Sequence, residues 1–147
     1  RSGGKIMLLP QVRIQYFARD RIVKLWRMYR EYGLFKPLVN IKLGAPATAR
    51  QFVPPLFVVS VIGLPLLALW WIFFGWLWIA MVVFYLSVVM LTALRIVQRG
   101  HRASAWGWTV IAFVCVHIAY GVGYLQGLVR FTLLRRRIRP ERIRTNR

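Results

Sequence analysis

The side chains that could do acid–base or metal chemistry are few and widely separated in this 147-residue chain. Its carboxylates are Asp20, Glu31 and Glu141, and its histidines, His101 and His117, fall in different settings. General acid–base catalysis needs titratable groups within reach of one substrate, and Mg²⁺ or Mn²⁺ needs oxygen ligands. No Asp-x-Asp pair, nucleophile motif or phosphate loop occurs. The sequence therefore predicts no catalytic residues, no metal site and no cofactor in this chain.

One group of polar and small residues lies inside an apolar segment: His117, Tyr120, Gly121, Gly123 and Gly127. An ionisable residue within a membrane segment is a functional candidate, although a lone neutral histidine also serves as a hydrogen-bonding partner for a neighbouring helix. Glycines four positions apart let two helices approach closely. We expect this group to pack helices, and the sharper hypothesis is that it binds a lipid head or an isoprenoid chain.

A long stretch without charge must position these residues. No charged side chain occurs from Gln51 to Leu94, and a membrane-spanning helix needs about 20 apolar residues. We predict two spans, 52–74 and 76–97, that form a hairpin turning at Gly75, entered through Pro54-Pro55. A third apolar segment, 106–129, completes a membrane domain over 52–129. The expected fold class is a mainly α-helical membrane protein.

The charge of the chain is strongly basic, with a formal net charge of +19. All 22 Lys and Arg residues lie outside the uncharged stretch and flank the apolar segments. Positive residues in such positions set membrane topology and meet anionic headgroups. We therefore expect a bilayer with anionic lipids as the partner, and no nucleic acid.

The positive-inside rule leaves the third apolar segment open to two interpretations. The rule places the N-terminal part, the 95–102 loop and the basic tail 130–147 on the cytoplasmic side. A full crossing by 106–129 would put the tail outside. The segment is either re-entrant, with a break near Gly121–Gly123, or it spans against the charge rule. Its periodicity favours a full crossing, and its charge favours a return.

The residues before the membrane domain fall into two parts. Alternation of Val12, Ile14 and Tyr16 with polar residues predicts a strand within 1–18. Residues 19–51 predict a basic amphipathic helix and a basic linker, with Asp20 as N-cap and Gly33 as the helix end. Tryptophan and tyrosine on the apolar side of such a helix favour a position in the membrane interface.

These segments together resemble one known family. Arg1-Ser-Gly-Gly-Lys-Ile6 followed by Tyr16-Phe-Ala-Arg19 resembles the end of a family 2 glycosyltransferase catalytic domain of GT-A-like fold. Tyr29-Arg-Glu-Tyr-Gly33-Leu-Phe-Lys36, Arg50-Gln-Phe-Val-Pro54-Pro55-Leu-Phe57 and His117-x-x-Tyr120-Gly121-x-Gly123 are similar to the membrane part of the bacterial succinoglycan-biosynthesis members. The resemblance covers about residues 1–130.

The resemblance implies an integral protein of the bacterial cytoplasmic membrane whose N-terminal side is cytoplasmic. It implies sugar transfer from a nucleotide sugar to a lipid-linked or polysaccharide acceptor, with Mg²⁺ or Mn²⁺ and the catalytic base in a domain upstream of Arg1. Lys36, Lys42 and Arg50 would then contact an acceptor diphosphate or lipid headgroups. The alternative is a small non-catalytic subunit that packs on a larger membrane complex.

Overall fold

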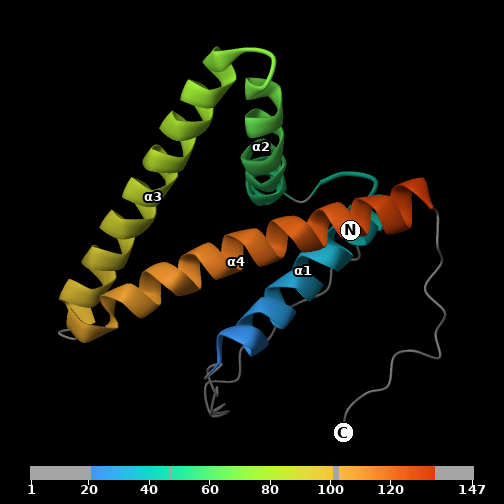
Figure 1. The fold of residues 1–147 in the computed structure, drawn as a ribbon. Helices are drawn as coiled ribbons and strands as arrows, with labels where there is room; N and C mark the ends of the chain where they lie inside the picture. Colours follow the sequence, from blue (N-terminus) through green and yellow to red (C-terminus); the bar gives the residue numbers. More distant parts are fainter. Residues whose placement is uncertain (1–20, 47, 101–102, 135–147) are drawn as a thin grey trace, which may run out of the picture.

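The structure is a computed structural model that describes residues 21–46, 48–100 and 103–134 (Figure 1). Within these ranges the chain is mainly helical and has no strand, which confirms the predicted α class. The α-helices are α1 (Ile22–Leu43), α2 (Val53–Ala68), α3 (Ile72–Gly100) and α4 (Trp106–Gly127), joined by the short 3₁₀ helices η1 (Ala49–Phe52) and η2 (Ala103–Ala105) and extended by the π-helical turn η3 (Leu128–Leu133). The strand predicted in 1–18, and the tail after residue 134, lie outside the described residues.

Helix α1 is longer than the sequence predicted. It begins after Arg21, and Asp20, the predicted N-cap, lies outside the described residues. The helix continues through Gly33 and ends at Gly44, whose φ of 70° suits a left-handed C-cap. The prediction that Gly33 ends the helix is wrong. Gly33 is buried inside α1 because it contacts the backbone of Tyr120 in α4.

Helices α2 and α3 form the predicted hairpin, but its turn lies elsewhere. Helix α2 ends at Ala68, and the carbonyl oxygen of Leu67 accepts hydrogen bonds from the amides of Trp70 and Trp71, both at 3.1 Å. Helix α3 then begins at Ile72 and contains Gly75, so the prediction of a turn at Gly75 is wrong. The turn therefore precedes the glycine, and Gly75 lies in the first turns of α3, where an added Cβ would be 3.6 Å from the Cβ of Ala68 across the tip.

Aromatic and hydrogen-bond contacts hold the two arms of the hairpin together. The rings of Phe57 and Tyr85 lie 4.2 Å apart between centroids. Nearer the tip, the indole nitrogen of Trp78 donates to the carbonyl oxygen of Val61 at 3.1 Å. The antiparallel arms therefore bring the start of α2 and the C-terminal part of α3 to one end of the hairpin, which we call its open end.

Helix α4 is continuous through Gly121 and Gly123. The break near Gly121–Gly123, one of the two interpretations of this segment, is therefore absent. In the described part of the chain, three helical segments are long and apolar enough to cross a membrane: Ala49–Ala68, Ile72–Gln98 and Trp106–Leu133. These segments fit an integral membrane protein, as the sequence predicted.

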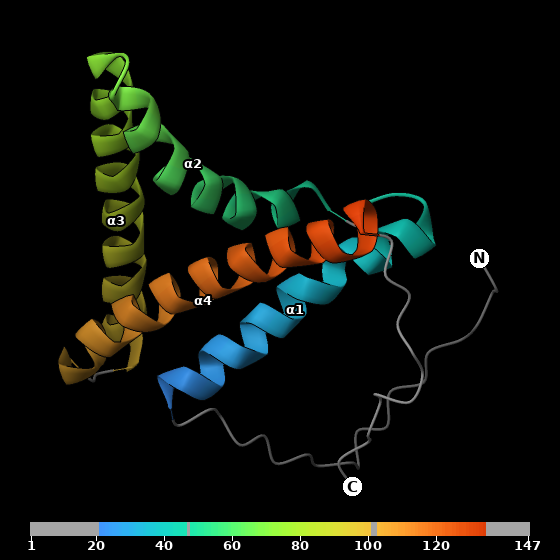
Figure 2. The ribbon, with the colours of Figure 1, turned by 45° about the vertical axis from the view of Figure 1, so that its right-hand side comes forward.

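The helices are arranged as a triangle with an added layer. Helices α2 and α3 diverge from their common turn, and α4 runs across their open end to close the triangle (Figures 1 and 2). Helix α1 packs along α4, on the side away from the hairpin turn in both views. The glycines in α4 and in α1 make these close approaches possible.

Candidate apolar site at the open end of the hairpin

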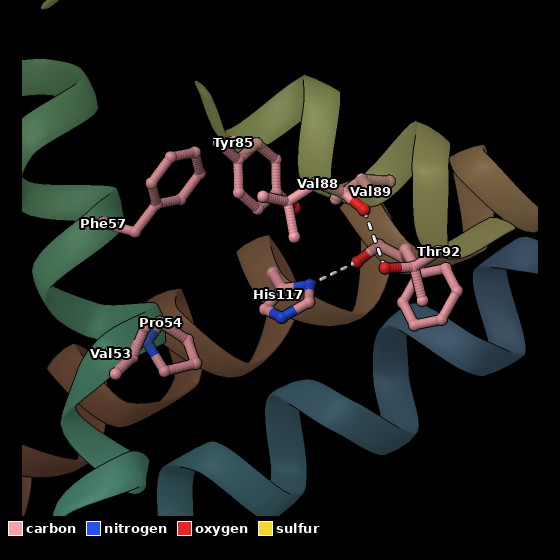
Figure 3. A pocket seen from close by; sticks show the side chains of 9 residues that line it. Val53, Pro54, Phe57, Tyr85, Val88, Val89, Thr92 and His117 are labelled. Carbon is pink, nitrogen blue, oxygen red and sulfur yellow. Dashed lines mark hydrogen bonds between the residues drawn. The ribbon is translucent and has the colours of Figure 1, made fainter. Parts of the chain in front are cut away.

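A cavity of about 210 Å³ lies where α2, α3 and α4 meet (Figure 3). Each helix contributes side chains to its wall from positions three or four residues apart, which share one helix face. The lining residues are Val53, Pro54 and Phe57 from α2, Tyr85, Val88, Val89 and Thr92 from α3, and Phe113 and His117 from α4. Most of this wall is apolar, so the cavity suits a hydrocarbon group better than a sugar or a phosphate.

Three rings follow one another along the cavity wall. The Tyr85 ring lies against Phe57 on one side and meets His117 edge-on at 5.7 Å on the other, with an interplanar angle of 87°. Figure 3 shows these rings reaching toward the space between the three helices. Contacts of this kind contribute orientation as well as burial. The rings therefore give the cavity a defined aromatic wall.

His117 has one nitrogen committed to its own helix. Its Nδ1 lies 2.9 Å from the carbonyl oxygen of Phe113, one helical turn earlier. Because a carbonyl oxygen only accepts hydrogen bonds, Nδ1 must carry the proton in this contact. In the neutral ring Nε2 then keeps its lone pair. His117 can thus accept a hydrogen bond from a ligand without becoming charged.

Two other residues of the cavity wall carry hydroxyl groups. Thr92 donates its hydroxyl proton to the carbonyl oxygen of Val88 at 2.7 Å, so that proton is already used. The hydroxyl oxygen of Tyr85 is buried and has no hydrogen-bond partner in the described part of the chain. A buried hydroxyl without a partner costs free energy. His117 is consequently the polar group best placed to bind the polar end of an otherwise apolar ligand, whereas the Tyr85 hydroxyl is enclosed by the protein.

The structure divides the group predicted from His117 to Gly127 among different surfaces. His117 lines the cavity between α2 and α3. Gly121 faces α2, where an added Cβ would overlap the carbonyl group of Pro54. Gly123 and Gly127 face α1 and lie against the backbone carbonyls of Arg30 and Leu34.

Tyr120 belongs with the α1 contacts and not with the cavity. Its carbonyl oxygen lies against Gly33, and its ring stacks on that of Tyr124 at 6.3 Å. Tyr124 is only 2% exposed, and its hydroxyl accepts a 3.4 Å hydrogen bond from the amide nitrogen of Asn40. The predicted group therefore combines one cavity residue with several helix-packing residues.

The three basic residues predicted to meet a diphosphate lie on separate turns. Lys36 is half-buried in the middle of α1, Lys42 is exposed in its last turn, and Arg50 is exposed in η1. Among the described residues, no contact joins any two of them. Lys42 also has the favourable position of a cation near a helix C-terminus. Their contact with a diphosphate or with headgroups stays a prediction.

Sequence reasoning missed Tyr85 and Thr92 as site residues. Both are polar groups seven positions apart in an uncharged apolar helix, which places them on one helix face. That spacing was the available signal, but the residues of α2 and α4 that complete the cavity lie 21–39 positions away in the sequence. The described residues contain no group of three or more His, Cys, Asp or Glu side chains able to hold a metal.

Comparison with known proteins adds no assignment to this geometry. No protein-family model, no curated protein and no solved structure matches the chain.

Proposed function

We propose that this chain is the membrane-anchoring part of a family 2 glycosyltransferase at the cytoplasmic face of a bacterial inner membrane. The enzyme would transfer a sugar from a nucleotide sugar to a lipid-linked or polysaccharide acceptor. The observation that carries the proposal is the attachment of basic α1 to α4 across the open end of the hairpin. This arrangement ties the segment that follows residue 20 firmly to the membrane helices.

Helix α1 supplies the cationic surface that such an anchor needs. Lys24, Arg27 and Lys42 are exposed on it, and cations at a membrane surface attract anionic lipids. A domain joined to the start of α1 would be held beside the headgroups, where a lipid-linked acceptor presents its polar end. Lys36, Lys42 and Arg50 would contribute positive charge to that surface.

The cavity supports an acceptor with a hydrocarbon part. Its wall is mostly apolar and includes the side chains of Tyr85 and His117. A polyprenyl or acyl chain entering between α2 and α3 would fill this space. Metal binding and the catalytic base would belong to the upstream domain, and this chain would anchor and orient.

The intact mass of the native polypeptide and the reading frame upstream of Arg1 test this proposal. We expect a mass well above 17.2 kDa and an upstream Asp-x-Asp motif. Membranes containing the full protein should transfer label from nucleotide sugars, and replacement of both motif aspartates by asparagine should abolish transfer. A native mass near 17.2 kDa, or a full protein without transfer activity, would overturn the proposal.

One observation favours the second candidate, a non-catalytic subunit of a membrane complex. A row of apolar side chains on α1 stays exposed and is spaced as one helix face: Tyr32, Phe35, Val39 and Leu43. A protein partner would bury this face, and so would the acyl layer of the bilayer. Co-purification of one stoichiometric partner from native membranes, together with the small mass, would support the subunit.

A further inference from the structure

Helices α1 and α4 run in the same direction and in a fixed register. The Sγ atom of Cys115 lies 3.9 Å from the carbonyl oxygen of Ile22. Further along, Gly123 lies against Arg30, and Gly127 lies against Leu34. Each of these pairs is separated by 93 positions in the chain. The two helices therefore lie side by side over residues 22–34 and 115–127. If α4 crossed the membrane, the residues of α1 beside it would lie at the same depth.

This register sets a condition on the position of α4. If the apolar segment Trp106–Leu133 crossed the bilayer, its middle would lie near Tyr120. Gly33 lies against the carbonyl group of Tyr120 and Arg30 lies against Gly123, so Arg30 lies near that level and Arg27 is one turn before it. Both arginine side chains are exposed. Charged side chains at the centre of a bilayer are strongly unfavourable, and they reach the surface only from near the helix ends.

The contacts of α4 with the hairpin also show that α4 lies across the two arms and does not run alongside them. At its start, the indole nitrogen of Trp106 donates to the carbonyl oxygen of Met90 in α3 at 3.4 Å. Farther along, Gly121 packs on the carbonyl group of Pro54 in the first turn of α2. Both contacts lie toward the open end of the hairpin. Figures 1 and 2 show α4 running from one arm to the other across that end.

We propose that α4 lies along the membrane surface with α1, so that only α2 and α3 cross the bilayer. The α1–α4 pair then forms an in-plane plate on the open end of the hairpin, and its partner is an anionic lipid surface. Helix α1 is the layer of this plate farther from the hairpin turn, and its exposed cations Lys24, Arg27 and Lys42 meet the headgroups.

This arrangement removes the conflict between charge and topology. The basic residues before α2, those at the C-terminal end of α3 and just after it, and the basic tail all lie on one side of the membrane, as the positive-inside rule requires. It does so with α4 unbroken, whereas the re-entrant interpretation required a break. The high apolar content of α4 follows from its place between the hairpin and α1.

Cysteine accessibility in sealed membranes tests the proposal. Single cysteines are placed in the full chain after Cys115→Ala: Trp70→Cys at the turn, Ser104→Cys in η2, and Thr145→Cys in the tail. A membrane-impermeant maleimide is applied before and after permeabilisation. We expect Thr145→Cys to behave like Ser104→Cys and opposite to Trp70→Cys. Labelling of Thr145→Cys on the same side as Trp70→Cys would overturn the proposal.

A depth measurement gives a second, independent result. A nitroxide at Arg27→Cys in vesicles of mixed neutral and anionic lipid should collide with a water-soluble relaxer at least as readily as one at Lys42→Cys. A spin label that behaves like one at Phe84→Cys, on the outer surface of the middle of α3, would contradict the in-plane position. Neither experiment measures sugar transfer, so their outcome is separate from that of the proposed transferase function.

Discussion

Gly123 in α4 lies directly against the backbone carbonyl group of Arg30 in α1, and a Cβ at position 123 would overlap that oxygen. A backbone carbonyl cannot turn aside as the end of a flexible side chain does. We therefore expect Gly123→Ala to separate the two helices and to lower the free energy of unfolding by about 1–3 kcal/mol, as overpacking does. Thermal unfolding in detergent, followed by circular dichroism, measures the loss.

A second glycine of the same helix provides the control. Gly107 has open space where a Cβ would be built. Gly107→Ala should therefore leave stability unchanged or raise it by about 0.5–1 kcal/mol, because alanine is the better helix former. Equal destabilisation by both substitutions would contradict a specific contact between Gly123 and Arg30.

The parallel register of α1 and α4 predicts one disulfide. Native Cys115 approaches the backbone of Ile22, with its Sγ 3.9 Å from that carbonyl oxygen, so Ile22→Cys introduces a second thiol at the residue it contacts. We expect mild oxidation to join the two residues within one chain. Intact mass would then fall by the two hydrogens lost, and both thiols would resist alkylation.

Position 41 distinguishes parallel from antiparallel packing. Ile41 is exposed near the far end of α1, so Ile41→Cys should stay reduced under the same conditions. Crosslinking through Ile41→Cys but not through Ile22→Cys would show that the helices run in opposite directions. That result would also remove the argument for an in-plane α4.

The sequence predicted the membrane helices but not their ends. An uncharged stretch from Gln51 to Leu94 requires two apolar helices, and hydropathy alone is sufficient to find them. The turn was misplaced because residues 69–76 are apolar throughout and carry no polar signal. Glycine was the remaining clue, and Gly75 proved to be a helix residue.

A similar ambiguity explains why Gly33 was wrongly predicted to end its helix. A glycine after an amphipathic run is equally consistent with a helix stop and with a close helix contact. The deciding partner, Tyr120, is 87 positions away in sequence. The cavity residues were likewise only partly predictable. His117 could be identified from its own segment, whereas Tyr85 becomes a cavity residue only because α2 and α4 pack around it.

The unpartnered hydroxyl of Tyr85 predicts an unusual substitution. Tyr85→Phe removes a buried group that has no hydrogen bond in the described structure. We expect the delipidated protein in detergent to gain about 1 kcal/mol of stability, since a buried polar group without a partner is unfavourable. Tyr124→Phe is the control, because it removes the hydrogen bond from Asn40 and should lose about 1 kcal/mol. A loss in Tyr85→Phe would mean that its hydroxyl has a partner.

The cavity predicts that an apolar chain remains bound during purification. Lipid extracted from the purified protein should include a species that Val88→Phe reduces, because the larger side chain occupies the space lined by Phe57 and His117. Each methylene excluded from an apolar site costs about 0.8 kcal/mol, so excluding two lowers affinity about tenfold. Mass spectrometry of the extract identifies the species and distinguishes a polyprenyl chain from an acyl chain.

Val83 on the same helix supplies the matched control for this experiment. It is exposed and does not line the cavity, so Val83→Phe adds the same ring to the outer surface of α3. We expect lipid retention to equal that of the unmodified protein. If both substitutions reduce retention equally, the lipid is bound by the outer surface of the hairpin. If neither does, the cavity is empty of lipid, and the support it gives to a lipid-linked acceptor is lost.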